Sequence, residues 1–213
     1  MKKCLLPVLL CLSAPSAVLA DEYVSVQYDA PDSVIVLNKT DGTSQQCVLT
    51  RKLEDAAPKF NWNQRVILLN NTDYVSVDAI QQCAGGKASP SSIPEHVGFV
   101  VDVNLEKKLY LSLDFVSVGV VTYAATVAKL GSKRPLGNFP GEYTVRKSVA
   151  RLQEEGITYM DSSPGRISVD GRYVSADGSM ECATYSHPGV WDLRTGKRVI
   201  RTDGCENLFP TGG

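Results

Sequence analysis

The sequence predicts a mainly β protein in which a small, disulfide-closed N-terminal module (residues 21–83) precedes a larger β-rich domain with a short helix (98–213). Short apolar segments rich in β-branched residues recur along the chain, and turn-forming residues separate them. The four cysteines beyond the first 20 residues fall two in each of these parts. No internal repeat of fixed period is visible, which argues against a complete solenoid or propeller.

Residues 1–20 have the composition of a secretory signal peptide. Lys2 and Lys3 precede the apolar run Leu5–Leu12, and small residues then lead to an A-x-A-like site before Asp21. This start is typical of bacterial exported proteins, so we expect cleavage near Asp21 and release into the periplasm or beyond, an oxidising compartment. No later apolar run approaches the roughly 18 residues that a membrane-spanning helix needs.

The N-terminal module is expected to be a set of short strands. Val24, Val26 and Tyr28 alternate with polar residues, which is typical of a half-buried strand. Asp41-Gly42 is a hairpin-turn signal, and Asp78–Cys83 is long enough for one helical turn. The other strands expected here are Val34–Leu37, Cys47–Leu49, Arg65–Leu69 and Tyr74–Val77, with a turn over Asn70–Asp73.

Residues 84–97 are predicted to be a linker, because most of this segment is rich in Gly, Ser and Pro and lacks a periodic apolar pattern. Beyond it, β-prone segments again alternate with polar turns. An i, i+4, i+7 apolar spacing that starts at Val145 predicts a short amphipathic helix over residues 146–155. The expected strands are Phe99–Val103, Lys108–Leu113, Val116–Tyr123, Gly137–Val145, Arg166–Val169, Arg172–Val174, Val190–Leu193 and Arg198–Arg201.

The cysteines predict two disulfides. An even count in an exported chain favours oxidised pairs, and three connectivities are possible. Proximity in the sequence favours Cys47 with Cys83 and Cys182 with Cys205, because each bridge would staple its own part of the chain. A four-thiolate zinc site would need paired C-x-x-C spacings, which the chain lacks. Neither a metal nor another cofactor is predicted.

The charge balance excludes a general nucleic-acid binder. The whole chain has 22 basic and 23 acidic residues, whereas nucleic-acid-binding domains are basic. One stretch is nevertheless positive and contains only Glu142 as an acid; it would suit an acidic partner or an anionic envelope polymer, or else be a solvated face. The residues of this basic stretch are Lys129, Lys133, Arg134, Arg146, Lys147 and Arg151.

Trp62 is an aromatic candidate for surface recognition. It is flanked by Phe60, Asn61 and Asn63, and tryptophan is enriched at the centres of protein interfaces. Packing in the core is the alternative for this side chain.

Residues 98–200 carry a partial resemblance to the L,D-transpeptidase (YkuD-type) domain of bacterial cell-wall enzymes. The resemblance implies a β-rich domain that acts on or binds peptidoglycan. Val100–Val103 with Lys108–Leu111 is similar to the opening hairpin of that family, and Thr195–Val199 is similar to its closing strand. Pro135–Phe139 is similar to the T-P-x-G-x-F segment, with Arg134 in place of Thr. Ser186–Gly189 lies near the position of the S-H-G-C motif.

The chain departs from that family at the residues that carry the chemistry. The family uses a cysteine thiolate directly after the His-Gly pair, and Gly189 stands in its place here. Cys182 near His187 is the remaining candidate for a displaced nucleophile and its base. The expected bridge from Cys182 to Cys205 would remove that thiol, so no catalytic residue is predicted.

A second, shorter resemblance is to one blade of a WD40-type β-propeller. Val169–Val174 is similar to S-x-D-G-x-x-V, and Val190–Lys197 is similar to V-W-D-x-x-T-G-K. One blade does not make a propeller, so this resemblance implies β-hairpins closed by Asp and Gly turns.

Taken together, these features predict an exported envelope protein that acts by binding a protein partner. The most concrete hypothesis is a non-catalytic inhibitor or immunity-type protein that blocks a toxin or hydrolase acting in the envelope. The alternatives are a divergent L,D-transpeptidase-like protein acting on or binding peptidoglycan, and an assembly subunit that docks through the basic stretch.

Overall fold

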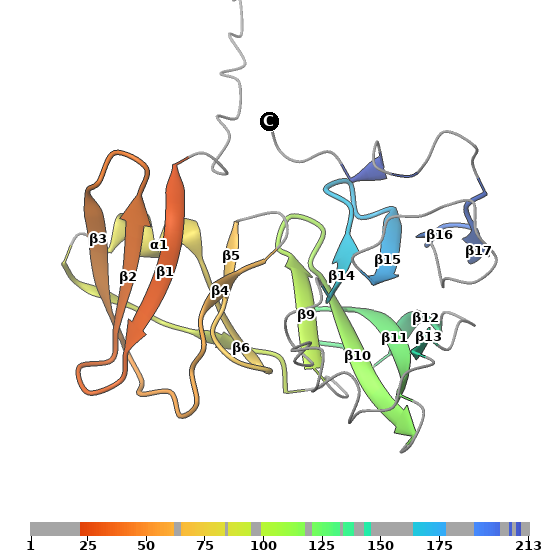
Figure 1. Cartoon of the computed structure of the whole chain (residues 1–213), viewed down its shortest axis with the longest axis horizontal. Helices are drawn as coiled ribbons and strands as arrows, with labels where there is room; N and C mark the ends of the chain where they lie inside the picture. Colours follow the sequence, from red (N-terminus) through yellow and green to blue (C-terminus); the bar gives the residue numbers. More distant parts are fainter. Residues whose placement is uncertain are drawn as a thin grey trace, which may run out of the picture.

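The described part of the chain consists of β-sheets and one short α-helix, as the sequence predicts (Figure 1). We call β1 to β8, with the helix α1, the N-terminal half, and β9 to β17 the C-terminal half. The computed structural model describes residues 22–61, 65–83, 85–94, 99–117, 121–132, 134–138, 143–145, 164–177, 190–200, 205 and 208–209.

The first sheet is built around a hairpin whose turn was expected at Asp41-Gly42. Gly42 adopts a positive φ of 83°, which glycine tolerates without steric cost, and Asp41 Oδ1 accepts a hydrogen bond from the Thr43 N–H. The order of strands is β1-β2-β3-β7, with β7 parallel to β3. The strands are β1 (Tyr23–Asp29), β2 (Val34–Lys39), β3 (Ser44–Leu49) and β7 (Lys87–Ala88).

The second sheet leads into the helix. Ser76 ends β6 and caps α1 (Val77–Gln82), because its side-chain oxygen accepts from the Ala79 N–H. The helical turn expected over Asp78–Cys83 is therefore present. The order of strands is β4-β5-β6-β8, and the strands are β4 (Lys59–Phe60), β5 (Val66–Leu68), β6 (Asp73–Ser76) and β8 (Ser91–Ser92).

Part of the segment expected as a linker is packed into these two sheets. Residues 84–97 contain β7, which pairs with β3, and β8, which pairs with β6. Ile93 follows β8 and is 1% exposed. Strands of two residues are too short to show an alternating apolar pattern, so they cannot be recognised in a segment rich in Gly, Ser and Pro. The division into two domains remains a prediction.

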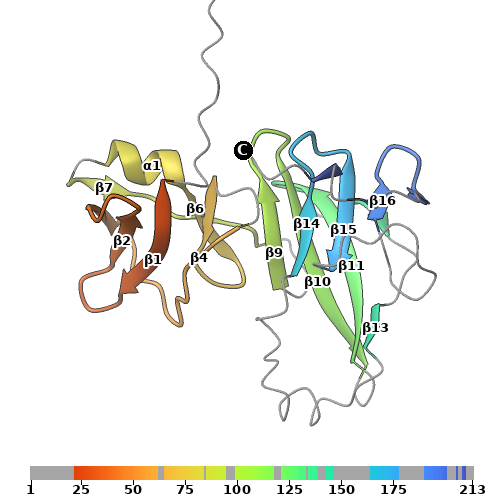
Figure 2. The same ribbon diagram turned by 45° about the horizontal axis from the view of Figure 1, so that its top comes forward.

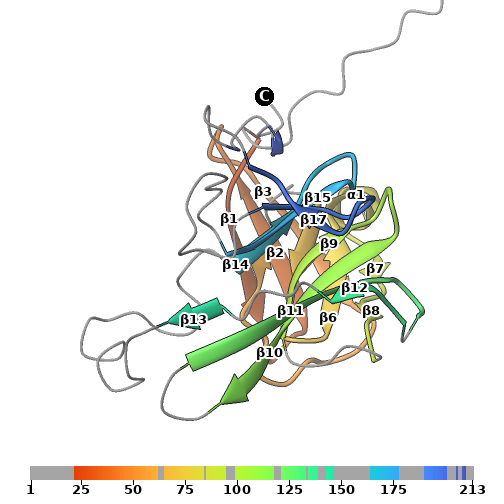
Figure 3. The same ribbon diagram turned by 90° about the vertical axis from the view of Figure 1, so that its right-hand side faces the viewer.

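The third sheet contains the long hairpin of β10 and β11. In Figure 3, which views the molecule along its longest axis, both strands run past the end of β9. The strand expected over Val116–Tyr123 is divided, because β10 ends at Ser117 and β11 begins at Val121. The strands are β9 (Phe99–Asn104), β10 (Leu109–Ser117), β11 (Val121–Lys129), β12 (Pro135–Asn138) and β13 (Tyr143–Val145), the last two pairing with β11.

The fourth sheet is an antiparallel meander that lies against the third (Figure 2). Its strands are β14 (Pro164–Ile167), β15 (Tyr173–Asp177), β16 (Val190–Asp192) and β17 (Lys197–Arg198). The helix expected over residues 146–155 lies outside the described residues.

The two halves share an apolar cluster. Val66, Leu68 and Ile93 from the N-terminal half pack with Val100 and Val103 of β9. A separate cluster around Leu111, Ile167 and Trp191 fills the space between the third and fourth sheets. Both strands contribute to both contacts: Tyr110 of β10 joins the cluster that the halves share, and Val101 of β9 packs against the cluster next to the fourth sheet.

Candidate functional site

Most residues that the sequence marked for function lie outside the described residues. Arg134 is described and exposed, directly before β12, and its backbone N–H donates to Ser132 Oγ at 3.1 Å. Lys129, also exposed, ends β11. Outside the described residues lie Trp62, Lys133, Arg146, Lys147, Arg151, Cys182 and His187.

One of the two expected disulfides is present. Cys47 of β3 and Cys83 after α1 form a disulfide with Cα atoms 5.9 Å apart, as the sequence predicts. Cys205 is buried and disulfide-bonded, and its partner lies outside the described residues. Cys47 and Cys83 are paired with each other. Among the cysteines beyond residue 20, this leaves Cys182 as the candidate partner of Cys205.

The most unusual titratable group in the described residues is Asp102, on β9. Its side chain is completely buried, and its two oxygens accept three hydrogen bonds. Asn61 Nδ2 donates to Oδ1 at 3.0 Å, the Val103 N–H donates to the same oxygen at 2.9 Å, and the Ile167 N–H donates to Oδ2 at 2.6 Å. One carboxyl thus joins the segment after β4, strand β9 and strand β14.

Burial raises the pKa of Asp102 to about 7, because an ionised carboxylate loses its hydration in the interior. The three hydrogen bonds and the nearby Arg166 guanidinium oppose this shift and only partly offset it. Asn61 Nδ2 also donates to the Val103 carbonyl at 2.7 Å, whereas Asn61 Oδ1 is buried and, among the described residues, has no donor. Both polar groups are therefore costly to enclose.

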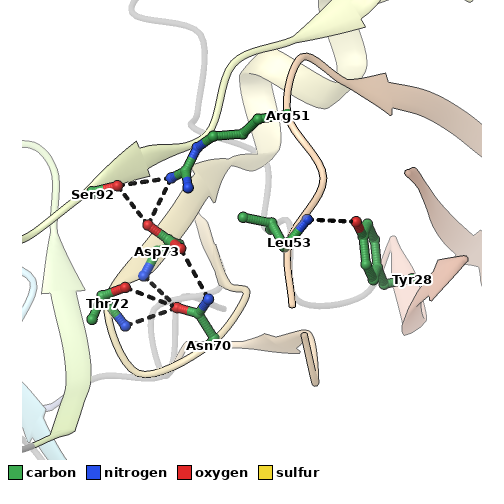
Figure 4. Close-up of polar contacts among 7 residues, drawn as sticks. All are labelled: Tyr28, Arg51, Leu53, Asn70, Thr72, Asp73 and Ser92. Atoms are coloured by element: carbon green, nitrogen blue, oxygen red, sulfur yellow. Dashed lines mark hydrogen bonds and ion pairs between the residues drawn. The ribbon is translucent and has the colours of Figure 1, made fainter. Parts of the chain in front are cut away.

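A second buried carboxylate, Asp73, lies at the start of β6 (Figure 4). Asp73 Oδ1 accepts from Arg51 Nη2 at 2.7 Å and from Ser92 Oγ at 2.5 Å, and Asn70 Nδ2 donates to Oδ2 at 2.9 Å. Burial raises the pKa of Asp73, but the hydrogen bonds from Arg51, Ser92 and Asn70 outweigh it and hold the pKa below its usual value. This carboxylate is ionised at neutral pH.

A third carboxylate, Asp192, ends β16. Arg172 donates to Asp192 Oδ2 through Nε at 3.1 Å and Nη2 at 2.8 Å, and its guanidinium lies 4.8 Å from the centre of the Tyr173 ring. The hydrogen bond from Arg172 is the main reason that the pKa of Asp192 is lowered. The pair fastens the start of β15 to the end of β16.

These contacts describe a framework of structural carboxylates rather than a catalytic centre. A general acid or base must reach the proton that it transfers, and the Asp102 carboxyl is enclosed by the protein. Within the described ranges, no group of three His, Cys, Asp or Glu side chains is arranged to hold a metal ion. Among the same residues, no helix is long and apolar enough to cross a membrane.

Reasoning from the sequence did not identify Asp73 or Asp102. Asp102 was visible as the one charged residue inside the apolar run Phe99–Val103, which is the available signal for a buried carboxyl. The sequence predicts a turn at Asp73, and its partner Arg51 is 22 residues away. No spacing in the sequence connects the two residues.

Models of known protein families give no match to this chain, and curated proteins give none either. The function is therefore inferred from the residues of the chain itself.

Proposed function

We propose that this protein is exported to the cell envelope and acts there by binding, as a non-catalytic inhibitor or immunity-type protein against an envelope-acting toxin or hydrolase. The observation that carries the proposal is the use of the buried carboxylates. Asp73 and Asp192, whose pKa values are lowered, each hold two or more elements together through hydrogen bonds. Their acceptor oxygens support the scaffold, and a rigid scaffold limits the entropy lost on binding.

The disulfides support the same proposal. The Cys47–Cys83 bridge is expected in an oxidising compartment and closes a segment of the N-terminal half. The alternative, a divergent L,D-transpeptidase-like protein, needs a free thiol at Cys182. Since Cys205 is disulfide-bonded and Cys182 is its expected partner, the binding role is the better supported of the two.

The test uses residues 21–213 purified in oxidised form. Muramidase, amidase and endopeptidase preparations are each mixed with purified cell walls, and the loss of turbidity is followed with increasing amounts of the protein. We expect stoichiometric inhibition of one enzyme class. Reversing the charges of Lys133 and Arg134 should weaken inhibition at least tenfold, if the basic stretch docks on the partner.

The matched control is Lys52→Glu, a charge reversal at an exposed lysine of the N-terminal half. It should leave the inhibition unchanged. No inhibition of any class, together with no survival benefit to cells that export the protein while challenged with envelope-acting toxins, would overturn the proposal. Cross-linking of stem peptides that is lost in Cys182→Ala would establish the transpeptidase-like alternative instead.

A further inference from the structure

Asp102 lies where the two halves of the molecule meet. Its carboxyl receives the Asn61 amide from the N-terminal half and the Ile167 N–H from β14, while the residue itself belongs to β9. The next residue, Val103, packs in the apolar cluster that both halves share. Any change in how well this carboxyl is accommodated therefore acts on the contact between the halves.

Burial of Asp102 disfavours its negative charge more strongly than the three donated hydrogen bonds favour it. The side chain has no exposed surface, so water cannot stabilise the ionised form. Asn61 Oδ1, on the amide that donates to Asp102, is a buried acceptor without a donor in the described part of the chain. A protonated carboxyl carries an O–H donor that the ionised form lacks.

We propose that Asp102 is a proton-operated latch, which holds the two halves together when protonated and loosens the contact when it ionises. The contact is then tighter in mild acid than at alkaline pH. The device belongs to the fold and does not depend on the identity of the partner.

Arg166 of β14 is the charged group whose electrostatic effect reaches Asp102. The neighbouring elements also carry Lys59 on β4, Arg65 before β5, and Glu106 and Lys107 in the β9–β10 turn. β9 itself carries no other titratable side chain, and Lys108 precedes β10. Arg166 favours the ionised carboxyl, but burial outweighs it and also lowers the pKa of Arg166. No second carboxylate is needed to explain the raised pKa of Asp102.

The sign of the effect follows from linkage. The pKa of Asp102 is about 7 when it is enclosed and 3.8 when it is open to water. The enclosed form therefore binds the proton more tightly. The equilibrium constant for closing the contact between the halves becomes up to about thirtyfold larger at pH 5.5 than at pH 8.5. Below pH 3.8 the advantage is complete, and it is lost as the pH rises through 7.

The proposal is tested by hydrogen–deuterium exchange at pH 5.5 and 8.5. The sample is the oxidised protein, residues 21–213, and the rates are corrected for intrinsic exchange. Protection in peptides covering residues 99–104 and 164–168 should fall by up to about thirtyfold at the higher pH. The β2–β3 hairpin serves as the internal reference and should change less. Equal protection of the two junction peptides at both pH values would overturn the proposal.

Two variants separate the latch from general effects of pH. In Asp102→Asn, protection at the junction should no longer depend on pH, whereas Asp73→Asn, at a buried carboxylate with a lowered pKa, should keep the wild-type response. A pH response that survives in Asp102→Asn would overturn the proposal. Should that variant fail to fold, carboxyl-carbon NMR of the wild type decides: a midpoint between pH 6 and 8 supports the latch, and an Asp102 that stays ionised down to pH 5 refutes it.

Discussion

Arg51 Nη2 lies 2.7 Å from Asp73 Oδ1 and forms an ion pair that joins the end of the first sheet to the start of β6. The same nitrogen lies 2.7 Å from Ser92 Oγ, and Ser92 in turn donates to Asp73 (Figure 4). Nearby, the Leu53 N–H donates to Tyr28 Oη at 3.0 Å, which fastens the chain after Arg51 back to β1. The two N-terminal sheets are thus held by polar contacts as well as by apolar packing.

Replacing Asp73 by asparagine should lower the free energy of unfolding by about 1–3 kcal/mol at pH 7, because Arg51 and Ser92 lose an ionised acceptor. The pKa of Asp73 is lowered in the folded state, so its stabilising effect is present above its unfolded pKa and is lost as the pH falls through the folded value. Urea denaturation at pH 7 and pH 3 measures both. The difference between wild type and variant should shrink in acid.

The control for this change is Asp29→Asn, at an exposed position on β1. It should change the stability by less than about 0.5 kcal/mol. A loss in Asp73→Asn that is the same at both pH values would mean that the carboxylate charge does not contribute.

Asp102 should give the opposite dependence on pH. Its pKa is raised to about 7, so its stabilising contribution is complete below its unfolded pKa and is lost as the pH rises through 7. Between pH 4 and pH 8, the loss of unfolding free energy from this one group is as much as about 4 kcal/mol. Urea denaturation across this range should show it, and the slope attributable to Asp102 should disappear in Asp102→Asn.

The strands of the N-terminal half could largely be predicted because their apolar residues alternate or cluster. Val24, Val26 and Tyr28 fall on β1, and the hairpin turn at Asp41-Gly42 closes β2 and β3. The strand predicted over Val116–Tyr123 overlaps only the start of β11 (Val121–Lys129), for a physical reason. Alanines are poor strand formers, and Ala124, Ala125 and Ala128 lie in the part of β11 that was missed.

The polar contacts could not be predicted in the same way. Arg51, Asp73 and Ser92 meet because β8 pairs with β6 and the chain after β3 passes nearby. Similarly, the Ile167 N–H reaches Asp102 from a strand 65 residues away. Such contacts depend on sheet topology, which local propensities do not specify. The expected pairing of Cys47 with Cys83 is confirmed. It could be predicted because a short separation in the sequence limits how far apart two cysteines can lie.

Removing the Cys47–Cys83 disulfide should cost about 3–4 kcal/mol of unfolding free energy. The bridge spans 36 residues, and its loss restores conformational freedom to that segment in the unfolded chain. Both cysteines should be replaced by alanine, because Cys47 is buried in the N-terminal core and alanine is apolar. Urea denaturation compares the double variant with wild type, and adding reductant to the double variant measures the disulfide at Cys205 separately. Equal midpoints for wild type and variant would contradict the prediction.

Gly171 and Gly196 form a matched pair of turn glycines. Both have a positive φ, 71° and 64°, in the turns before β15 and β17. A Cβ at Gly171 would lie 2.7 Å from Lys107 Cγ and 3.2 Å from Leu109 Cδ1, whereas a Cβ at Gly196 would meet nothing within 4 Å. The Gly171 turn therefore packs closely against the β9–β10 hairpin.

Alanine should consequently be tolerated unequally at the two sites. Each substitution costs about 1–2 kcal/mol for a side chain in the left-handed region. Gly171→Ala should lose about 1–3 kcal/mol more, because Lys107 Cβ and Cγ lie close to the backbone and cannot swing away as the end of that side chain could. Urea midpoints with unchanged m-values measure the difference. Equal losses in the two variants would show that the β14–β15 turn can move away from the β9–β10 hairpin without cost, and that this contact does not fix the fourth sheet against the third.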